Sequence, residues 1–180
     1  RPPLTGSVRL PSLAERPAVR QKHLPMVPAC IGHGGSAGGE TLLKSIDPLL
    51  NADVLHALRA MGHGDEIAIV DANFPAATMA RRLVRLPGST ATEALAAVLS
   101  LMPLDDFVDH PAAAMDAPGE RPAIYPEFEA AMAAAEGRPV ALEPVERFAF
   151  YERAKATYAT IATGERRLYA NIIVKKGVIR

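Results

Sequence analysis

A short apolar run with a polar boundary on each side sets the strongest limit on this fold. Residues 67–70 carry no polar side chain, which is typical of a strand buried on both faces of a sheet. Gly62 ends the helical spacing of apolar residues before the run, and Asp71 follows it directly. A strand of this kind needs helices against both faces of its sheet, so the sequence predicts an α/β protein.

The spacing of apolar residues predicts helices and strands that alternate along the rest of the chain. The expected helices are 48–61, 75–81, 90–102, 126–136 and 147–157, and the expected strands are 67–70, 83–86, 112–115, 140–142, 158–163 and 168–174. A tight turn at 164–167 is expected to place the last two strands side by side. The predicted architecture is a three-layer α/β/α fold with a mainly parallel sheet and a C-terminal antiparallel hairpin.

The composition changes near residue 40. Residues 1–40 contain six prolines and a glycine-rich run, and they show little apolar periodicity. Such a segment buries too little surface to offset the entropy of ordering it. We expect a disordered extension, or a sequence of upstream or artificial origin, without a catalytic role. Residues 41–180 are expected to form one domain.

Charge, hydropathy and cysteine content limit the binding partners, the cellular location and the metal sites that are expected. The chain has 20 Lys and Arg against 20 Asp and Glu, so no overall field attracts nucleic acid or an anionic membrane. No run approaches the roughly 18 to 20 apolar residues of a membrane helix, so a soluble chain is expected. The only cysteine, Cys30, excludes an internal disulfide framework and makes the cytoplasm the expected location. No metal is expected, because the adjacent Asp65 and Glu66 diverge on entering a strand.

His63 and Asp71 are the first candidates for a functional site. Ligands of a parallel sheet bind outside the carboxyl ends of its strands, and Asp71 lies at such an end. His63 belongs to the loop before the same strand, so a fold-back of that loop or a neighbouring subunit is needed to bring it there. An imidazole and a carboxylate together are suited to proton transfer near neutral pH.

Several motifs together resemble the RbsD/FucU family of sugar mutarotases. They are His-Gly-Asp-Glu at 63–66, Asp-Ala-Asn-Phe-Pro at 71–75, Arg-Phe-Ala-Phe-Tyr-Glu-Arg-Ala at 147–154, Thr-Gly-Glu-Arg at 163–166, Tyr-Ala-Asn-Ile at 169–172 and Lys-Lys-Gly-Val at 175–178. The resemblance covers about residues 42–179. The second and third motifs are similar to the L-fucose mutarotase branch more than to the D-ribose pyranase branch.

The resemblance implies a fold, an activity and a set of site residues. His63 matches the family's general acid, and the sugar-contacting positions match Asp71, Arg147, Tyr169, Ala170 and Asn171. The family acts without metal or organic cofactor and assembles as ring-like homo-oligomers, commonly decamers, with sites near subunit contacts. The implied activity is interconversion of the α and β anomers of L-fucose or a related aldose. A D-ribose pyranase and a non-catalytic sugar-binding protein that supports uptake are the alternatives.

All of these candidate residues except Ala170 also have a simpler interpretation. His63 can be a solvated residue at a helix end, and Asp71 can cap the helix that follows. Arg147 can form a minor surface ion pair with a neighbouring glutamate. Tyr169 and Asn171 can be ordinary strand and turn residues.

Overall fold

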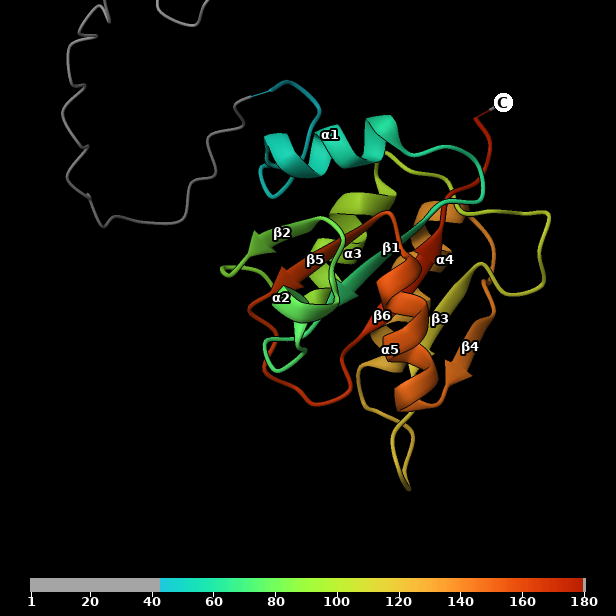
Figure 1. Cartoon of the computed structure of the whole chain (residues 1–180). Coiled ribbons are helices and arrows are strands. Elements are labelled where there is room, and N and C mark those ends of the chain that lie inside the picture. Colours follow the sequence, from blue (N-terminus) through green and yellow to red (C-terminus); the bar gives the residue numbers. More distant parts are fainter. Residues whose placement is uncertain (1–42, 180) are drawn as a thin grey trace, which may run out of the picture. The chain divides into compact units, whose positions relative to one another are not determined.

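A mixed sheet of six strands forms the centre of the protein in the computed structural model (Figure 1). The structure describes residues 43–179. The strand order is β2-β5-β1-β6-β3-β4. The strands are β1 (Glu66–Val70), β2 (Leu83–Leu86), β3 (Ala112–Met115), β4 (Leu142–Val145), β5 (Ala159–Thr163) and β6 (Ile172–Lys175). β1 pairs with β5, β2 with β5 and β3 with β4 in parallel, whereas β6 runs antiparallel to both β1 and β3.

Helices cover both faces of this sheet. They are α1 (Ala52–Ala60), α2 (Ala76–Met79), α3 (Ala91–Leu99), α4 (Tyr125–Glu136) and α5 (Arg147–Ala156). Figure 1 shows α2 and α5 in front of the sheet and α3 and α4 behind it. Alternate side chains of β1 pack on opposite faces of the sheet. Ile67 and Ile69 belong to the core under α1, α3 and α4. Ala68 and Val70 belong to the core under α2 and α5.

The predicted three-layer fold and its mainly parallel sheet are confirmed, and the last strand has the expected antiparallel direction. The neighbours of this strand differ from the prediction. β1 lies between β5 and β6, so β5 and β6 do not pair directly. The chain from 164 to 171 is a loop, and Tyr169 in it has a φ of 61° that no strand adopts. β6 therefore begins at Ile172 and not at 168.

Other boundaries differ from the prediction for local reasons. The first helix begins at Ala52, because the Asn51 side chain accepts a hydrogen bond from the Val54 N–H (3.0 Å), whereas Asp47 closes only a turn. The second helix is limited to Ala76–Met79. β4 is shifted to 142–145 and contains Pro144, which a strand at the edge of a sheet tolerates.

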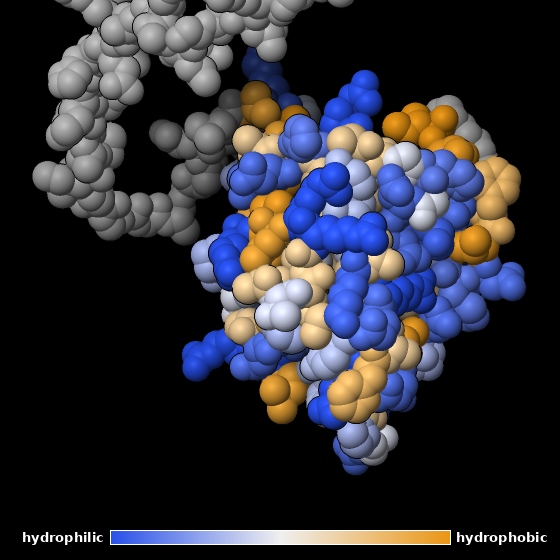
Figure 2. Space-filling model, in the orientation of Figure 1, coloured by the Kyte–Doolittle hydropathy of each residue, from blue (hydrophilic) through white to orange (hydrophobic). Residues whose placement is uncertain are grey.

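The described range limits what the structure says about the N-terminal extension and about membrane helices. The expected extension at 1–40, with Cys30 in it, lies outside residues 43–179. Within that range, every helix is too short or too polar to cross a bilayer. The face drawn in Figure 2 is dominated at its middle by hydrophilic residues over α5, and apolar residues gather in small groups around them.

The loop between β5 and β6 is fixed by a buried carboxylate. Glu165 is 5% exposed, and its carboxylate accepts hydrogen bonds from the backbone N–H groups of Arg166 (2.9 Å) and Arg167 (3.0 Å). The Arg167 guanidinium donates to the same carboxylate (3.0 and 2.9 Å) and also pairs with Glu127 of α4. Hydrogen bonding to Arg167 lowers the pKa of Glu165 to about 2 against the opposing effect of burial.

Backbone contacts tie the same loop to its neighbours. The Glu165 carbonyl accepts a hydrogen bond from the Ala72 N–H (2.8 Å), which joins the loop to the residue after Asp71. Gly164 approaches the chain after β2 so closely that a Cβ would lie 2.2 Å from the Pro87 carbonyl oxygen. Only glycine fits there without a shift of the backbone. The loop therefore carries residues 168–171 in a fixed position.

The core under α2 and α5 depends on Phe150, which is fully buried and meets Phe74 edge to face with ring centroids 6.2 Å apart. We expect Phe150→Ala to lower the free energy of unfolding by about 3–5 kcal/mol, because it removes apolar contacts and leaves a cavity. Phe148→Ala is the matched control, since Phe148 is 61% exposed, and a loss below about 1 kcal/mol is expected there. Urea unfolding measures both, and equal losses would contradict the assignment.

Glu165 should make stability depend on acid. Its pKa is depressed in the folded state, so its contribution is present above the ordinary value near 4.5 and is lost as the pH falls toward 2. We expect Glu165→Gln to lower the free energy of unfolding at pH 7 by about 2 kcal/mol. The difference from the wild type should shrink as the pH falls through this window. Urea unfolding at several pH values tests this, and a constant difference would refute it.

Candidate functional site

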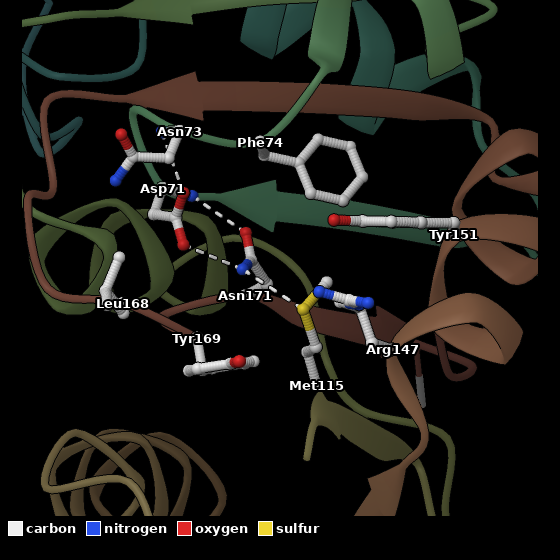
Figure 3. Close-up of a pocket in the computed structure, with 9 residues that line it drawn as sticks. All are labelled: Asp71, Asn73, Phe74, Met115, Arg147, Tyr151, Leu168, Tyr169 and Asn171. Atoms are coloured by element: carbon white, nitrogen blue, oxygen red, sulfur yellow. Dashed lines mark hydrogen bonds between the residues drawn. The ribbon is translucent and has the colours of Figure 1, made fainter. Parts of the chain in front are cut away.

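A cavity of about 150 Å³ opens at the carboxyl ends of β1 and β3 (Figure 3). Four segments contribute to it: the chain after β1, the end of β3, the first turns of α5 and the loop before β6. The lining residues are Asp71, Asn73, Phe74, Met115, Arg147, Tyr151, Leu168, Tyr169 and Asn171. The cavity therefore lies where ligands of a sheet of this kind bind.

Asp71 and Asn171 form a reciprocal pair at the base of the cavity. The Asp71 N–H donates to Asn171 Oδ1 (2.9 Å), and Asn171 Nδ2 donates to Asp71 Oδ2 (2.8 Å). The other carboxylate oxygen, Oδ1, accepts the Asn73 N–H (2.8 Å). Both side chains are almost fully buried, so this pair fixes the direction of the carboxylate.

The surroundings of the Asp71 carboxyl raise its pKa above the ordinary value. Burial raises the pKa of the Asp71 carboxyl, and hydrogen bonds from Asn73, Asn171 and the backbone of Phe74 and Ala170 only partly oppose this effect. A carboxyl with a raised pKa gives and takes protons closer to neutral pH than an ordinary aspartate. The bond to the Asn73 N–H also agrees with the capping interpretation, and capping does not prevent a second role.

Arg147, Tyr151 and Tyr169 also line the cavity. Arg147 begins α5, and its guanidinium lies 4.6 Å from the centre of the Phe148 ring. The surface ion pair considered for it is not formed, since Glu143 pairs with Arg153 and Glu146 accepts the N–H groups at the start of α5. No carboxylate among residues 43–179 pairs with the Arg147 guanidinium, so within this range its donors are available to a ligand.

The loop before β6 delivers three of the five residues predicted to contact a sugar. Tyr169 and Asn171 line the cavity, and the positive φ of Tyr169 turns the chain between them. Ala170 does not line it, because its side chain is fully buried in the core under α3 and α4. Ala170 acts instead through its backbone, which supports the Asp71 carboxylate.

His63 lies at the other end of the sheet. It occupies the turn before β1, whereas Asp71 follows β1, and five strand residues at about 3.3 Å each separate them by roughly 16 Å. His63 does not line the cavity that holds Asp71. The fold-back that would unite the two within one chain is therefore not formed.

His63 has a carboxylate partner that the sequence did not indicate. Its Nε2 lies 3.2 Å from Asp105 Oδ1, and its ring meets Phe107 edge to face at 5.6 Å. Burial raises the pKa of Asp105, but hydrogen bonds from the Phe107 N–H and from His63 outweigh it, so the net pKa is lowered. Asp105 is 42 residues from His63 and belongs to no motif, so no spacing could have paired them.

The geometry yields two candidate functional groups, one at each end of β1. The cavity offers a buried carboxyl, an amide, a guanidinium and two phenols, which suits a ligand rich in hydroxyl groups. The His63–Asp105 pair offers an oriented imidazole whose side chain is 47% exposed. Between Leu43 and Ile179 no three His, Cys, Asp or Glu side chains gather closely enough to hold a metal ion.

Comparison with known proteins agrees with this arrangement. The human fucose mutarotase is 42% identical over 146 residues, which cover 76% of this chain and 94% of the human protein. The L-fucose mutarotase of Actinobacillus pleuropneumoniae is 41% identical over 140 residues, covering 76% of this chain and 97% of that protein.

A solved structure and a family profile extend the comparison to the fold. The fucose mutarotase of Streptococcus pneumoniae in complex with L-fucose matches with a TM-score of 0.71 and 40% identity, covering 77% of this chain and all of that one. The profile of the RbsD/FucU transport protein family matches residues 44–179. The fold, the identities and the extent of the match together show that this chain belongs to the RbsD/FucU family.

Proposed function

We propose that this protein is a cofactor-independent mutarotase that interconverts the α and β anomers of L-fucose or a related aldose. The observation that carries the proposal is the buried Asp71–Asn171 pair at the base of a cavity lined by Arg147 and two tyrosines. The names of its relatives, which are mutarotases of fucose in the human, bacterial and solved examples, support the same substrate.

The lining suits a sugar that has one apolar end. Asp71, Asn73 and Asn171 gather on one side of the cavity as labelled in Figure 3, and they can bind adjacent hydroxyl groups. Phe74 and Met115 supply apolar surface, which favours a methyl group over a hydroxymethyl group. A 6-deoxy aldose such as L-fucose combines both features.

Anomer exchange requires two proton transfers. A proton must reach the ring oxygen and another must leave the anomeric hydroxyl, so that the ring opens to an aldehyde, C1 rotates, and the ring closes again. Asp71, with its raised pKa, and the Tyr169 phenol lie in the cavity and can serve one side of the sugar. His63 serves the other side as general acid and base, oriented by Asp105.

His63 can reach a sugar in this cavity only from a second copy of the chain. Its distance from Asp71 within one chain excludes an internal contact. Large apolar side chains are exposed beside both groups, with Phe107 (67%) next to His63 and Leu168 (67%) in the cavity wall. An interface that joins two different patches repeats from copy to copy and gives a closed ring when the rotation between copies closes. We propose such a ring-like homo-oligomer, with a decamer as one such assembly. The cytoplasm is the proposed location.

The activity is tested by saturation-transfer NMR on equilibrated sugars. We expect faster exchange between the anomers of L-fucose, with D-ribose as the sugar that would reveal a pyranase. His63→Ala should lower the exchange rate about 100-fold to 10,000-fold, because it removes one proton-transfer group, while sugar binding survives. His56→Ala is the control, since His56 is exposed on α1 away from the cavity. Binding of sugar without any accelerated exchange would refute the enzymatic proposal.

Mixing two inactive variants tests whether copies share a site. His63→Ala keeps an intact cavity and Asp71→Asn keeps an intact His63, so a mixed ring contains interfaces with both wild-type groups. Random assembly at equal amounts should restore up to about a quarter of the wild-type activity. The mixture is dissociated and reassembled before the NMR measurement, and each variant alone is treated in the same way. A mixture no more active than its components would show that copies do not share the site.

A further inference from the structure

The end of β6 lies between the two loops that carry His63 and Asp105. The Lys176 carbonyl accepts the Gly64 N–H and the Lys176 N–H donates to the Asp65 carbonyl, both at 2.9 Å. On its other side, the Lys175 carbonyl accepts the Asp105 N–H (3.1 Å). One short segment therefore sets the relative position of both partners of the imidazole–carboxylate pair.

The Lys176 side chain adds a contact of its own to the loop that carries His63. Its Nζ donates to the carbonyls of Leu58 and Met61, each at 2.7 Å. Both carbonyls belong to the C-terminal end of α1, where a helix leaves acceptors free and where its dipole favours a cation. Met61 is only two residues before His63, so this bond fixes the point from which the histidine turn starts.

The opposite side of the segment is closely packed against the Asp105 loop. A Cβ on Gly177 would lie 2.3 Å from the Leu104 carbonyl oxygen and 3.0 Å from the Asp105 nitrogen. The Gly177 N–H also donates to the Pro103 carbonyl (2.8 Å). The Asp105 loop therefore packs directly on the backbone of β6, and the position of the His63 turn depends on how firmly α1 is held to the same strand.

Neither of the nearby cations in the described range, Lys175 and Arg59, makes this contact. Lys175 points its ammonium to Glu66 (2.9 Å), and Glu66 is also held by Arg153. Arg59, in the last turn of α1, is exposed. Among residues 43–179, the ammonium of Lys176 is the side-chain donor bound to the carbonyls of Leu58 and Met61.

We propose that Lys176 is a positioning residue for anomer exchange, which acts through His63 by clamping the end of α1 to β6. This inference rests on the proposed function, because it assigns the proton-transfer role to His63. Lys176 lies at the amino end of β1, opposite the cavity that binds the sugar, and does not touch that cavity. Its loss should therefore affect the chemical step and leave sugar binding unchanged.

The experiment measures kcat and KM for L-fucose anomer exchange in Lys176→Met, together with the side-chain NMR signals of His63. We expect kcat to fall about 10- to 100-fold with KM unchanged, because a displacement of about 1 Å at a catalytic group is enough for such a loss. The His63 signals should shift. Lys176→Arg should recover most of kcat, since it keeps a cation and donors at the same place.

Lys155→Met is the matched control, because Lys155 forms an exposed pair with Glu152 on α5 and removal of this charge should leave kcat unchanged. If Lys176→Met does not fold, Lys176→Gln repeats the test, since the amide keeps one donor and should give a smaller loss of kcat with the same KM. An unchanged kcat, or parallel losses in kcat and sugar affinity, would overturn the proposal.

The failure of the proposed function is distinguishable from the failure of this inference. Absence of accelerated exchange in the wild-type protein would refute the function itself. The His63 signals remain measurable in that case, and signals unmoved by Lys176→Met would refute the positioning role independently.

Discussion

The antiparallel pairing of β6 with β1 is the constraint on which both functional groups depend. In this register Glu66 lies opposite Lys175 and Ile69 opposite Ile172. The pairing continues beyond the strands at both ends, with Asn171 beside Asp71 at one end and Lys176 beside the His63 turn at the other. A shift of one residue would break both sets of contacts and turn every buried side chain of β6 to the opposite face. The β1–β6 register therefore fixes the cavity at one end of the sheet and the His63–Asp105 pair at the other end.

The buried side chains of Asp71, Asn171 and Glu165 are tolerated because each has hydrogen-bond partners. Asp71 and Asn171 satisfy one another and the adjacent backbone, and Glu165 is surrounded by donors from its own loop. The two carboxyls nevertheless differ, since the pKa is raised for Asp71 and lowered for Glu165. Glu165 has a guanidinium against it and Asp71 has only neutral donors. The guanidinium beside Glu165 suits a structural anchor, and the neutral donors around Asp71 suit a group that exchanges protons, as proposed for it.

The sequence predicts the elements better than their order in space. Apolar runs such as 67–70 identify buried strands because burial on both faces leaves no other composition. The neighbour of β6 was not predictable, since a turn near Gly164 fits a hairpin equally well and strand order depends on contacts between distant segments. The motifs pointed to Asp71, Arg147, Tyr169 and Asn171, which the fold brings to one cavity. The left-handed conformation of Tyr169 and the Asp105 partner of His63 follow only from the folded chain.

The separation of His63 from the cavity has a chemical rationale. Opening a sugar ring needs proton transfer at two oxygens, and the residues around one half-open cavity approach the sugar mainly from one side. If His63 is the second proton-transfer group, as proposed, its place at the far end of β1 means that the site is completed by association of copies. In the proposed ring, assembly would control activity, because a single copy has the cavity proposed to bind the sugar but no imidazole beside it. The rigid β1–β6 pair makes this arrangement accurate, since it fixes in each copy both the cavity that receives a histidine and the histidine that is supplied to the next copy.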